Sequence, residues 1–428
     1  MHKNRRTFLK NMGLGVAGTL ALPAQSWSNS KAPLQSAINE LHQFPDKNLE
    51  NYWETVAKQF QFAEGVKYFN NASLGACPYP IRKATNTFRD TLDDFPSKYM
   101  WGGWGEEKEA TRQKVASVFS VSEEEIALIH NTTEGMNLIA QSLRLEPGDE
   151  VILSDHEHAS AVVPWTVWQA SKGIKLIRPT LPILPKTKEE ILAIFKAAIR
   201  PRTKVISLCH IVNTNGMMLP IKEISKMAHE NGVLVAVDGA QGAGMVKTDL
   251  REMDCDFYTV SAHKWLFAPK GIGIFYAKKE QQELLKPLIV ARGYKDPSIR
   301  RLENYNTRNL PELLGLGAAI DYRNSIGEDR IHKRTYELKD YFLKTIESSD
   351  LIVTKTPSSN DLSAGIQVVE IKGKDVQAVK EELFNDFGID SRPMSKFGLN
   401  AVRLSFAIFI TKKDIDHLVT ALKTIAKT

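Results

Sequence analysis

The middle of this chain alternates short apolar segments, rich in β-branched residues, with longer segments whose apolar residues recur at helical spacing. Strands are predicted at residues 126–129, 150–154, 174–178, 204–210, 233–237, 257–260 and 272–276. Helices are predicted at residues 107–119, 134–143, 159–171, 188–199 and 221–230. Because apolar strands that alternate with helices are typical of parallel sheets, we expect an α/β fold whose mainly parallel sheet is covered on both faces.

The N-terminus has the layout of an export signal. A basic head is followed by a short apolar run at residues 12–24 and then by small polar residues. The run is too short and too rich in glycine to span a membrane. The segment RRTFLK, which begins at Arg5, resembles a twin-arginine signal, so we expect the twin-arginine machinery to carry the folded protein to the periplasm. The alternative is a disordered basic tail; cleavage is predicted near Ser26.

Beyond about residue 300 the pattern changes to long helices and then to strand, helix and strand. Helices are predicted at residues 313–325, 331–348, 376–387 and 414–426, and strands at residues 365–371 and 401–406. This pattern predicts a smaller α+β domain. We therefore predict an export signal at residues 1–26, a linker and N-terminal helical segment at 27–65, a large domain at 66–300 and a small C-terminal domain at 301–428.

Charge and cysteine content argue against a nucleic-acid-binding protein and against a disulfide-rich scaffold. The formal net charge is +6, but removal of residues 1–26 takes away four cations and leaves 52 basic against 50 acidic residues. A body so nearly neutral gives no electrostatic indication of nucleic-acid binding. The three cysteines, Cys77, Cys209 and Cys255, are too few for a disulfide framework, and Cys209 lies in an apolar run typical of burial.

An aspartate and a lysine follow neighbouring predicted strands. Asp238 ends a strongly apolar strand, where an unpaired carboxylate would be costly, and Lys264 follows the next strand within the segment SAHK. This is the pair that pyridoxal phosphate needs. The amine can condense with the cofactor aldehyde, and the carboxylate can hold the pyridine nitrogen protonated. A structural ion pair is the alternative interpretation of Asp238.

Other polar residues follow other strands, where ligands bind in such sheets. Thr132 and Thr133 open a helix, and they indicate either a phosphate cradle or an ordinary helix cap. Asn213 is either a donor to the cofactor's phenolic oxygen or a turn residue. The segment DHEH, which ends at His158, allows three interpretations: a metal site, a histidine stacked on the cofactor ring, or a polar loop. No further ligand cluster supports a metal.

Six segments in order closely resemble the class V aminotransferases of fold type I, a family that includes cysteine desulfurases, selenocysteine lyases and proteins similar to isopenicillin N epimerase. They are HNTTEGMNLIAQSL, SDHEHASAVVPW, IVNTNG, VAVDGAQGAG, DFYTVSAHKWLFAPKGIGIFY and YNTRNLPELLGLGAAIDY. The resemblance covers residues 66–428. It implies a large domain with a seven-stranded sheet and pyridoxal 5'-phosphate as cofactor.

The same resemblance implies roles for individual residues around the cofactor ring. Lys264 corresponds to the Schiff-base lysine, and Asp238 to the partner of the pyridine nitrogen. His158 corresponds to the histidine that stacks on the ring, and Gln241 to the residue near the phenolic oxygen. The residues expected at the cofactor's phosphate are Thr132, Thr133, Ser261 and His263.

The resemblance also implies a partner subunit and a substrate. Thr307 corresponds to a threonine that reaches the phosphate in the neighbouring subunit, so we expect a homodimer. Arg403 corresponds to the arginine that binds the substrate carboxylate, and Asn71 lies in a loop that lines the substrate cleft; a structural ion pair is the alternative for Arg403. Aromatic residues at Tyr99 and nearby positions are expected to form either a wall for a bulky substrate or a packed cluster.

The chain departs from the desulfurases in one segment. DSRPMSKFGLNAVR, which ends at Arg403, is short and has no cysteine, so persulfide chemistry lacks its nucleophile there. The segment YFNNASLGACPYP looks more like the epimerase-like branch. Transamination, epimerisation and elimination all use one lysine base and one electron sink, so the sequence leaves them open. The first interpretation is therefore an exported enzyme that acts on an amino acid or amine-bearing substrate. The alternatives are a carbon–sulfur or carbon–selenium lyase and a protein that keeps the fold without catalysis.

Overall fold

The computed structural model describes residues 22–347 and 349–428. The predicted export signal therefore lies outside the described residues up to position 21, and its last five residues open helix α2 (Leu22–His42). Cleavage near Ser26 would remove the start of this helix. Among the described helices, none is both long enough and apolar enough to cross a membrane.

A seven-stranded sheet forms the centre of the molecule, with the order β2-β8-β7-β6-β5-β3-β4. Strand β8 runs antiparallel to both of its neighbours, and the other strands run parallel to one another. The bounds are β2 (Ile126–Ile129), β3 (Glu150–Ile152), β4 (Lys175–Ile177), β5 (Thr203–Cys209), β6 (Leu234–Asp238), β7 (Phe257–Ser261) and β8 (Gly273–Ala277). The predicted mainly parallel sheet is confirmed.

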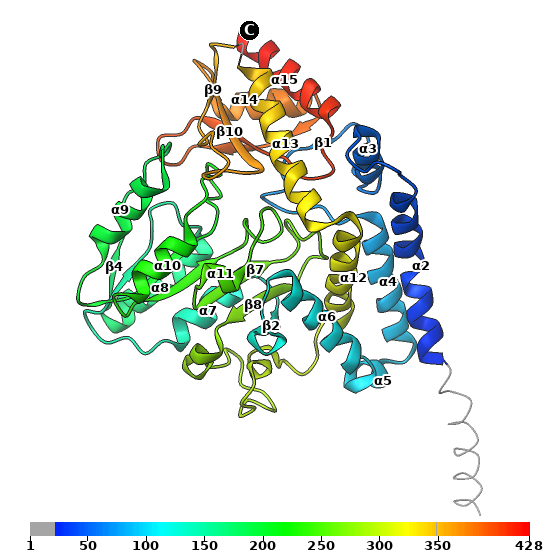
Figure 1. The fold of residues 1–428 in the computed structure, drawn as a ribbon, viewed down its shortest axis with the longest axis vertical. Helices are drawn as coiled ribbons and strands as arrows, with labels where there is room; N and C mark the ends of the chain where they lie inside the picture. The colour runs from blue at the N-terminus through cyan, green and yellow to red at the C-terminus, as the bar shows by residue number, and fades with distance from the viewer. Residues whose placement is uncertain (1–21, 348) are drawn as a thin grey trace, which may run out of the picture.

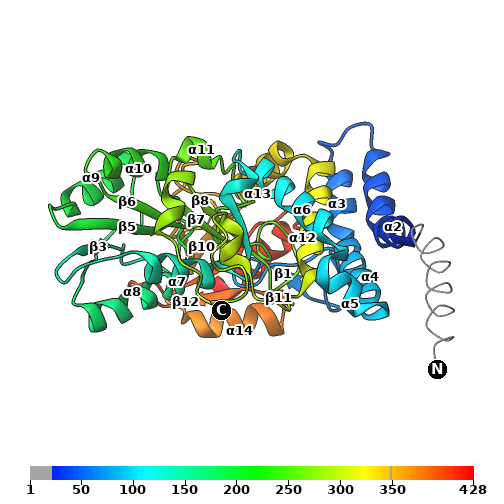
Figure 2. The same cartoon turned by 90° about the horizontal axis from the view of Figure 1, so that it is seen from below.

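Helices cover both faces of this sheet. Figure 2 shows α7 and α8 on one face and α9, α10 and α11 on the other. Their bounds are α7 (Thr132–Ser142), α8 (Ala159–Lys172), α9 (Lys188–Ala198), α10 (Ile221–His229) and α11 (Leu250–Met253). Strands β2, β6, β7 and β8 are buried along almost their whole length, as expected for strands covered on both sides.

A layer of helices packs beside the β2 end of the sheet, where α2, α4 and α12 lie side by side and α6 contacts α12 (Figure 1). The helices of this layer and its connections are α3 (Glu50–Lys58), α4 (Tyr79–Asp94), α5 (Pro96–Lys98), α6 (Gly105–Val118) and α12 (Leu310–Ile326). No helix was predicted at α4, although Pro80 stands in its first turn, where proline favours helix initiation.

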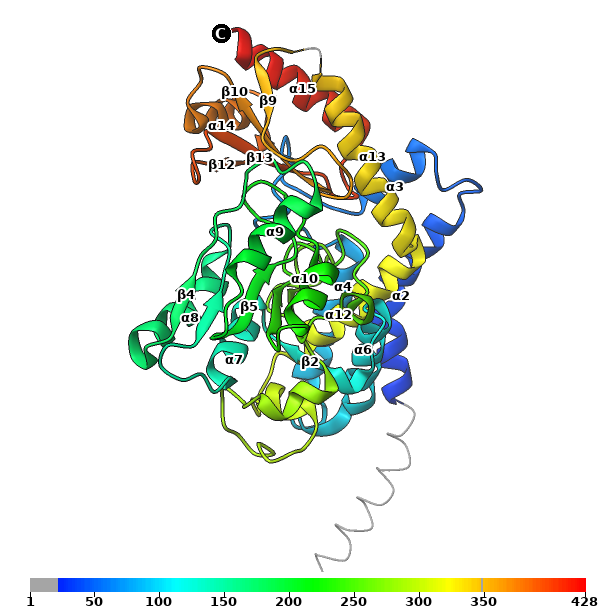
Figure 3. The same cartoon turned by 60° about the vertical axis from the view of Figure 1, so that its left-hand side comes forward.

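The C-terminal part forms a second, antiparallel sheet with the order β12-β13-β10-β9, seen at the top of Figure 3. Its elements are α13 (Glu328–Ile346), β9 (Ile352–Thr354), β10 (Ile366–Ile371), α14 (Val376–Asn385), β12 (Arg392–Met394), β13 (Ala401–Ser405) and α15 (Lys412–Lys427). The predicted smaller α+β unit is confirmed. Strand β1 (Lys67–Tyr68) pairs with β11 (Ile389–Asp390), so the chain crosses to this unit early. The residue boundaries of the four regions stay predictions.

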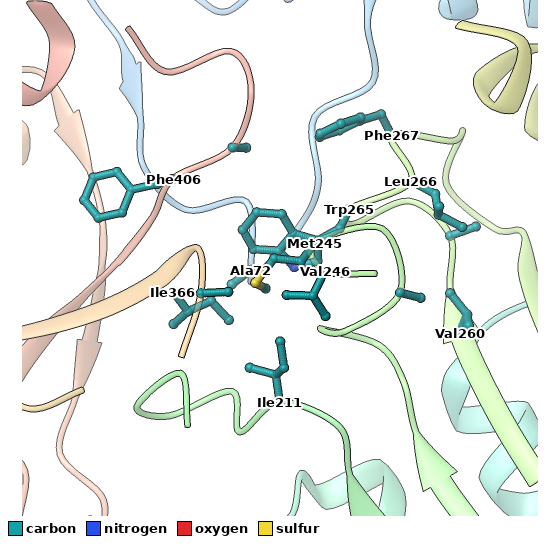
Figure 4. Packing of buried hydrophobic residues seen from close by; sticks show 14 of the residues in the cluster. Ala72, Ile211, Met245, Val246, Val260, Trp265, Leu266, Phe267, Ile366 and Phe406 are labelled. Atoms are coloured by element: carbon teal, nitrogen blue, oxygen red, sulfur yellow. The ribbon is translucent and has the colours of Figure 1, made fainter. Parts of the chain in front are cut away.

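A hydrophobic cluster joins the two sheets behind the turn that carries Lys264. Figure 4 shows the indole of Trp265 close to Met245, Val246 and Ala72. Trp265 is 2% exposed, and its indole nitrogen donates to Gln241 Oε1 at 2.8 Å. A tryptophan that is buried and hydrogen-bonded in this way fixes the backbone next to Lys264.

Candidate active site

Two adjoining cavities lie at the carboxyl ends of the parallel strands, the edge where ligands bind in such sheets. The larger has a volume of about 450 Å³ and reaches the C-terminal sheet, and the smaller has about 100 Å³ and lies against the central sheet. The residues that line both cavities are His158, Asn213, Gln241 and Lys264. Lys264 therefore stands where the two cavities meet.

Asp238 and Lys264 lie together at this junction, as the sequence predicted. Asp238 lines the smaller cavity, is 4% exposed and accepts the Ala240 N–H at 2.9 Å. Burial raises the pKa of Asp238, against the opposing charge of Lys264. Burial lowers the pKa of Lys264 to about 8, with the Arg403 charge adding to this and Asp238 opposing it. An amine with this pKa is partly unprotonated near neutral pH.

The N-terminal loop holds the backbone of Lys264 in place. Asn71, which is fully buried, donates from Nδ2 to the Lys264 carbonyl at 3.2 Å and accepts the Ala76 N–H at 3.0 Å. Asn71 is absent from the lining of both cavities, so it contacts the turn rather than the cleft. Gly75 packs so tightly that a Cβ atom there would lie 1.8 Å from the His263 carbonyl oxygen.

Gly75→Ala is expected to lower the free energy of unfolding by about 2–3 kcal/mol, because the clash is with backbone that cannot rotate away. Urea denaturation of both proteins measures this loss. Gly105→Ala is the matched control, since a Cβ at Gly105 would meet nothing within 4 Å. Equal stability of wild type and Gly75→Ala would show that the loop does not hold the Lys264 turn.

The predicted phosphate ligands are only partly brought together. The Ser261 hydroxyl donates to Thr132 Oγ1 at 3.0 Å and accepts the Thr132 N–H at 3.1 Å, which joins the end of β7 to the start of α7. Thr132, Thr133 and Ser261 all line the smaller cavity. His263 lines neither cavity, and burial lowers its pKa to about 4. The start of helix α7 and the three hydroxyls thus bring to one cavity the kinds of donor that suit an anion.

Thr307 lies away from both cavities of its own chain. It is exposed, and it follows a segment held by Glu303, which accepts the Leu128 N–H of strand β2 at 2.5 Å and two bonds from the buried Arg112 guanidinium of helix α6. Arg308 donates to the Leu128 carbonyl oxygen at 2.7 Å. Thr307 is thus presented outward from a firmly held segment.

Three predicted ring contacts line both cavities. His158 accepts the Ser160 N–H at 3.2 Å through Nδ1 and caps helix α8, so its ring proton sits on Nε2. Gln241 donates to the Ala72 carbonyl oxygen at 2.8 Å, so its amide is already engaged by the protein. The Asn213 carbonyl oxygen accepts from Arg403, and Asn213 lines both cavities.

Arg403 lies in the wall of the larger cavity on strand β13. Its Nη1 donates to the Asn213 carbonyl oxygen at 2.7 Å, and its Nη2 donates to Ser73 Oγ at 2.5 Å. The side chain is 3% exposed, and its Nε has no hydrogen-bond partner. Burial lowers the pKa of Arg403 to about 10, with Arg392 adding to the effect. Among the described residues, no acidic side chain forms an ion pair with Arg403, which excludes the alternative of a structural ion pair.

Glu157 is a cavity residue whose importance the sequence analysis missed. It lines the larger cavity, and its Oε1 accepts from the Ser154 hydroxyl at 2.5 Å. Burial is the largest cause that raises the pKa of Glu157 to about 8, and the Asp238 charge adds to it. At neutral pH this carboxyl is mainly protonated, so it adds little negative charge beside Asp238.

Glu157→Gln is expected to stabilise the protein increasingly as the pH rises from 5 to 7. In that range the unfolded wild type has lost the Glu157 proton and the folded form keeps it, so wild-type stability falls by roughly 1 kcal/mol per pH unit through this group. Glutamine has no proton to lose. Urea titrations at several pH values measure the difference, and Glu64→Gln, at an exposed position, is the control. A difference independent of pH would contradict a protonated Glu157.

Within the DHEH segment, Asp155 Oδ1 lies 3.8 Å from His156 Nε2, and the side chains of the segment also contact residues outside it. Asp155 accepts the Leu181 N–H at 3.1 Å, and the rings of His156 and Phe397 lie 4.4 Å apart. Within residues 22–347 and 349–428, no group of three histidine, cysteine, aspartate or glutamate side chains is placed to hold a metal ion. The metal interpretation of this segment is therefore not supported by the geometry.

Two of the aromatic residues after residue 98, Tyr99 and Trp104, pack together. The rings of Tyr99 and Trp104 lie 4.8 Å apart, and Trp104 packs edge-on against Phe88. Trp101 is 65% exposed, and none of these residues lines the two cavities. The aromatic wall is thus not formed around this chain's own site.

The cysteines are separate from the larger cavity. Cys209 is 5% exposed and lines only the smaller cavity, which confirms its predicted burial. Cys77 and Cys255 line neither cavity. All three thiols are free.

Curated proteins of two activities are similar to this chain. Isopenicillin N epimerase of Streptomyces clavuligerus is 30% identical over 387 residues, which cover 86% of this chain and 97% of that protein. A probable cysteine desulfurase of Halalkalibacterium halodurans is 31% identical over 339 residues, which cover 74% of this chain and 81% of that protein.

Solved structures share the fold. The apo cysteine desulfurase of Thermococcus onnurineus NA1 has a TM-score of 0.77 at 24% identity, over 87% of this chain and 98% of that one. A lysine variant of C-DES, with glycine covalently linked to its PLP cofactor, has a TM-score of 0.76 at 20% identity, over 89% and 99%. The family model described as aminotransferase class-V matches residues 103–418. With most of its length inside that match, this chain belongs to the class V aminotransferase family.

Proposed function

We propose that this protein is an exported, pyridoxal-phosphate-dependent enzyme that acts at the amino-bearing carbon of an amino acid or amine-bearing metabolite, by aminotransferase or epimerase chemistry. One observation carries the proposal. Lys264 lines two adjoining cavities. The smaller one is also lined by Asp238 and by the hydroxyl cradle, which consists of Thr132, Thr133 and Ser261. The larger one is also lined by Arg403. A cofactor in the first and a substrate in the second would both reach the same amine.

Pyridoxal phosphate is the cofactor of this family, and the residues of the smaller cavity fit it. Its phosphate would be held by the start of α7 together with Thr132, Thr133 and Ser261, and Asp238 would hold a proton at its ring nitrogen. Asp238 is a buried carboxylate whose charge needs a cationic partner at the cavity. His158 would lie against the ring. When bound, this cofactor supplies an electron sink for the substrate carbon.

The chain's own residues supply binding and proton transfer. Arg403, already fixed by Asn213 and Ser73, offers its free Nε–H to a substrate carboxylate. Lys264, with its pKa lowered to about 8, takes the proton from the substrate α-carbon. Epimerisation requires that solvent or a second donor protonates the same carbon on its opposite face, and protonation elsewhere gives transamination. The rigid turn behind Lys264 keeps its Nζ between substrate and cofactor.

Incubation of the holoenzyme with a panel of amino acids in D₂O tests the proposal. We expect one deuterium at the α-carbon of the accepted substrates. Loss of optical activity would assign epimerisation, and amino transfer to a 2-oxo acid would assign transamination. A holoenzyme that exchanges no α-proton with any amino acid or amine would contradict the proposal and favour a protein that keeps the fold without catalysis.

A carbon–sulfur or carbon–selenium lyase is the second candidate, favoured by the similarity to a probable cysteine desulfurase. The larger cavity contains no cysteine, so a persulfide would have no place to form near the substrate. Release of sulfide or selenide from cysteine, cystine or selenocysteine at a rate above α-proton exchange would favour the lyase over our proposal.

We also propose a homodimer. The support is the outward presentation of Thr307 from its anchored segment and the apolar residues exposed nearby in sequence, Ile289, Val290 and Tyr294. In such a dimer Thr307 would contact the phosphate in the partner's site. A monomer by light scattering at micromolar concentration would contradict this. Export through the twin-arginine machinery to the periplasm rests on the sequence around Arg5, and Arg5→Lys together with Arg6→Lys is expected to keep the protein in the cytoplasm.

A further inference from the structure

The wall of the larger cavity carries more positive charge than one substrate carboxylate requires. Its basic residues are Lys264, Arg392, Lys396 and Arg403, and its one acidic residue is Glu157. Burial raises the pKa of Glu157 to about 8, so this carboxyl neutralises little of that charge at neutral pH. With Lys264 assigned to the cofactor and Arg403 to the α-carboxylate, Arg392 and Lys396 are left over.

Strand pairing places two of these cations on one face. Arg392 of β12 is the direct cross-strand neighbour of Arg403 of β13, so both guanidinium groups project from the same side of the sheet into the cavity. Like charges in directly opposite positions destabilise a sheet. The Arg392 charge opposes the charge of Arg403, since it contributes to the lowered pKa of Arg403. An anionic group of the substrate beside each guanidinium would offset this repulsion.

The positive charges of Arg392 and Lys396 are not paired with any neighbouring carboxylate that the structure describes. In the described part of the chain, neither Arg392 nor Lys396 forms an ion pair with a carboxylate. Asp390 lies near Arg392, but its carboxylate accepts from Asn70 Nδ2 at 3.4 Å, and burial raises its pKa. Asp390 also lies outside the cavity lining.

The cofactor's phosphate does not account for these cations either. The hydroxyl cradle of Thr132, Thr133 and Ser261 lines the smaller cavity, and neither Arg392 nor Lys396 lines it. Both residues lie on the far side of Lys264, where the larger cavity of about 450 Å³ opens towards the C-terminal sheet. The surplus charge therefore faces the substrate.

We infer that the substrate is an amino acid with a second carboxylate, bound by Arg392 and Lys396, while Arg403 binds the α-carboxylate. This inference takes the type of reaction from the proposed function. The class of substrate is inferred from the charged residues of the cavity wall. Arg403 with its free, buried Nε fixes one end of the substrate, and the two exposed cations fix the other. A neutral side chain would leave both cations without a partner.

Calorimetry with amine-free acids tests the subsite without turnover. We expect the holoenzyme to bind glutarate at least about tenfold more tightly than butyrate, since a second charge-assisted contact is made. In the double variant Arg392→Gln, Lys396→Gln this preference should fall below about twofold. Lys372→Gln, at an exposed position in the turn directly after strand β10 and outside the cavity, should keep it. Because the exchanged residues are exposed, these variants are expected to fold, and circular dichroism verifies it.

Exchange kinetics separate this inference from the proposed function. For glutamate or 2-aminoadipate, the double variant should raise KM about tenfold with kcat nearly unchanged, and for glutamine KM should not change. Equal binding of glutarate and butyrate by the wild type, or a preference that survives the double substitution, would overturn the subsite even if neutral amino acids exchange their α-protons. A glutarate preference without any α-proton exchange would support the subsite and overturn the proposed function.

Discussion

Replacement of Lys264 by alanine is expected to reduce α-proton exchange by about 10³-fold or more, because the group that takes and returns the proton is lost. Lys264 is the one lysine that lines both cavities, and its pKa of about 8 suits a base near neutral pH. The rate is measured as deuterium uptake in D₂O at saturating amino acid, with the cofactor content of each preparation determined separately.

Lys270→Ala is the matched control for this experiment. Lys270 lies six residues further along the same turn and donates to the Gly75 carbonyl oxygen, and it lines neither cavity. Its replacement should leave the exchange rate within about threefold. A small added amine such as methylamine should partly restore exchange in Lys264→Ala, since it can enter the vacated volume. Unchanged exchange in Lys264→Ala would show that another group is the base.

Asp238→Asn is expected to have the second largest effect, a loss of about 10³-fold in the rate of α-proton exchange. Asparagine keeps an oxygen for the Ala240 N–H bond but loses the charge that would hold a proton at the ring nitrogen. Because burial already raises the pKa of Asp238, the neutral side chain should not lower the unfolding free energy by more than about 1 kcal/mol. The variant therefore separates catalysis from stability.

A cofactor analogue methylated at the ring nitrogen provides the control for Asp238→Asn. Its positive charge does not depend on a proton, so it should raise the variant's exchange rate above the rate with the natural cofactor. Wild-type protein should gain nothing from the analogue. Full exchange by Asp238→Asn with the natural cofactor would contradict the role assigned to this carboxylate.

The sequence predicts the arrangement of the large domain because strands that are buried on both faces of a sheet consist almost entirely of apolar residues. Apolar strands followed by polar residues predict where the carboxyl ends meet, and Asp238, Thr132 and Lys264 are found there. Ser261 and His263 are only two residues apart in the sequence, yet only Ser261 lines a cavity. A strand ends at Ser261, and the turn that follows carries the His263 side chain away.

Contacts between distant segments are what the sequence does not predict. Asn71 is expected in the cleft, yet it bonds the Lys264 carbonyl, because the N-terminal loop packs under the turn. The neighbourhood of Arg392 and Arg403 follows from the register of two short strands, of which β12 gives no clear pattern in the sequence. The sequence around Glu157 is typical of a polar loop, whereas in the folded protein this side chain is buried.

Reduction of the purified holoenzyme with borohydride, followed by peptide mass spectrometry, shows directly which lysine holds the cofactor. We expect the cofactor to become permanently attached to the peptide that contains Lys264, and Asp238→Asn to keep this attachment while losing exchange. Attachment at a different lysine, or none in a preparation that holds the cofactor, would contradict this expectation.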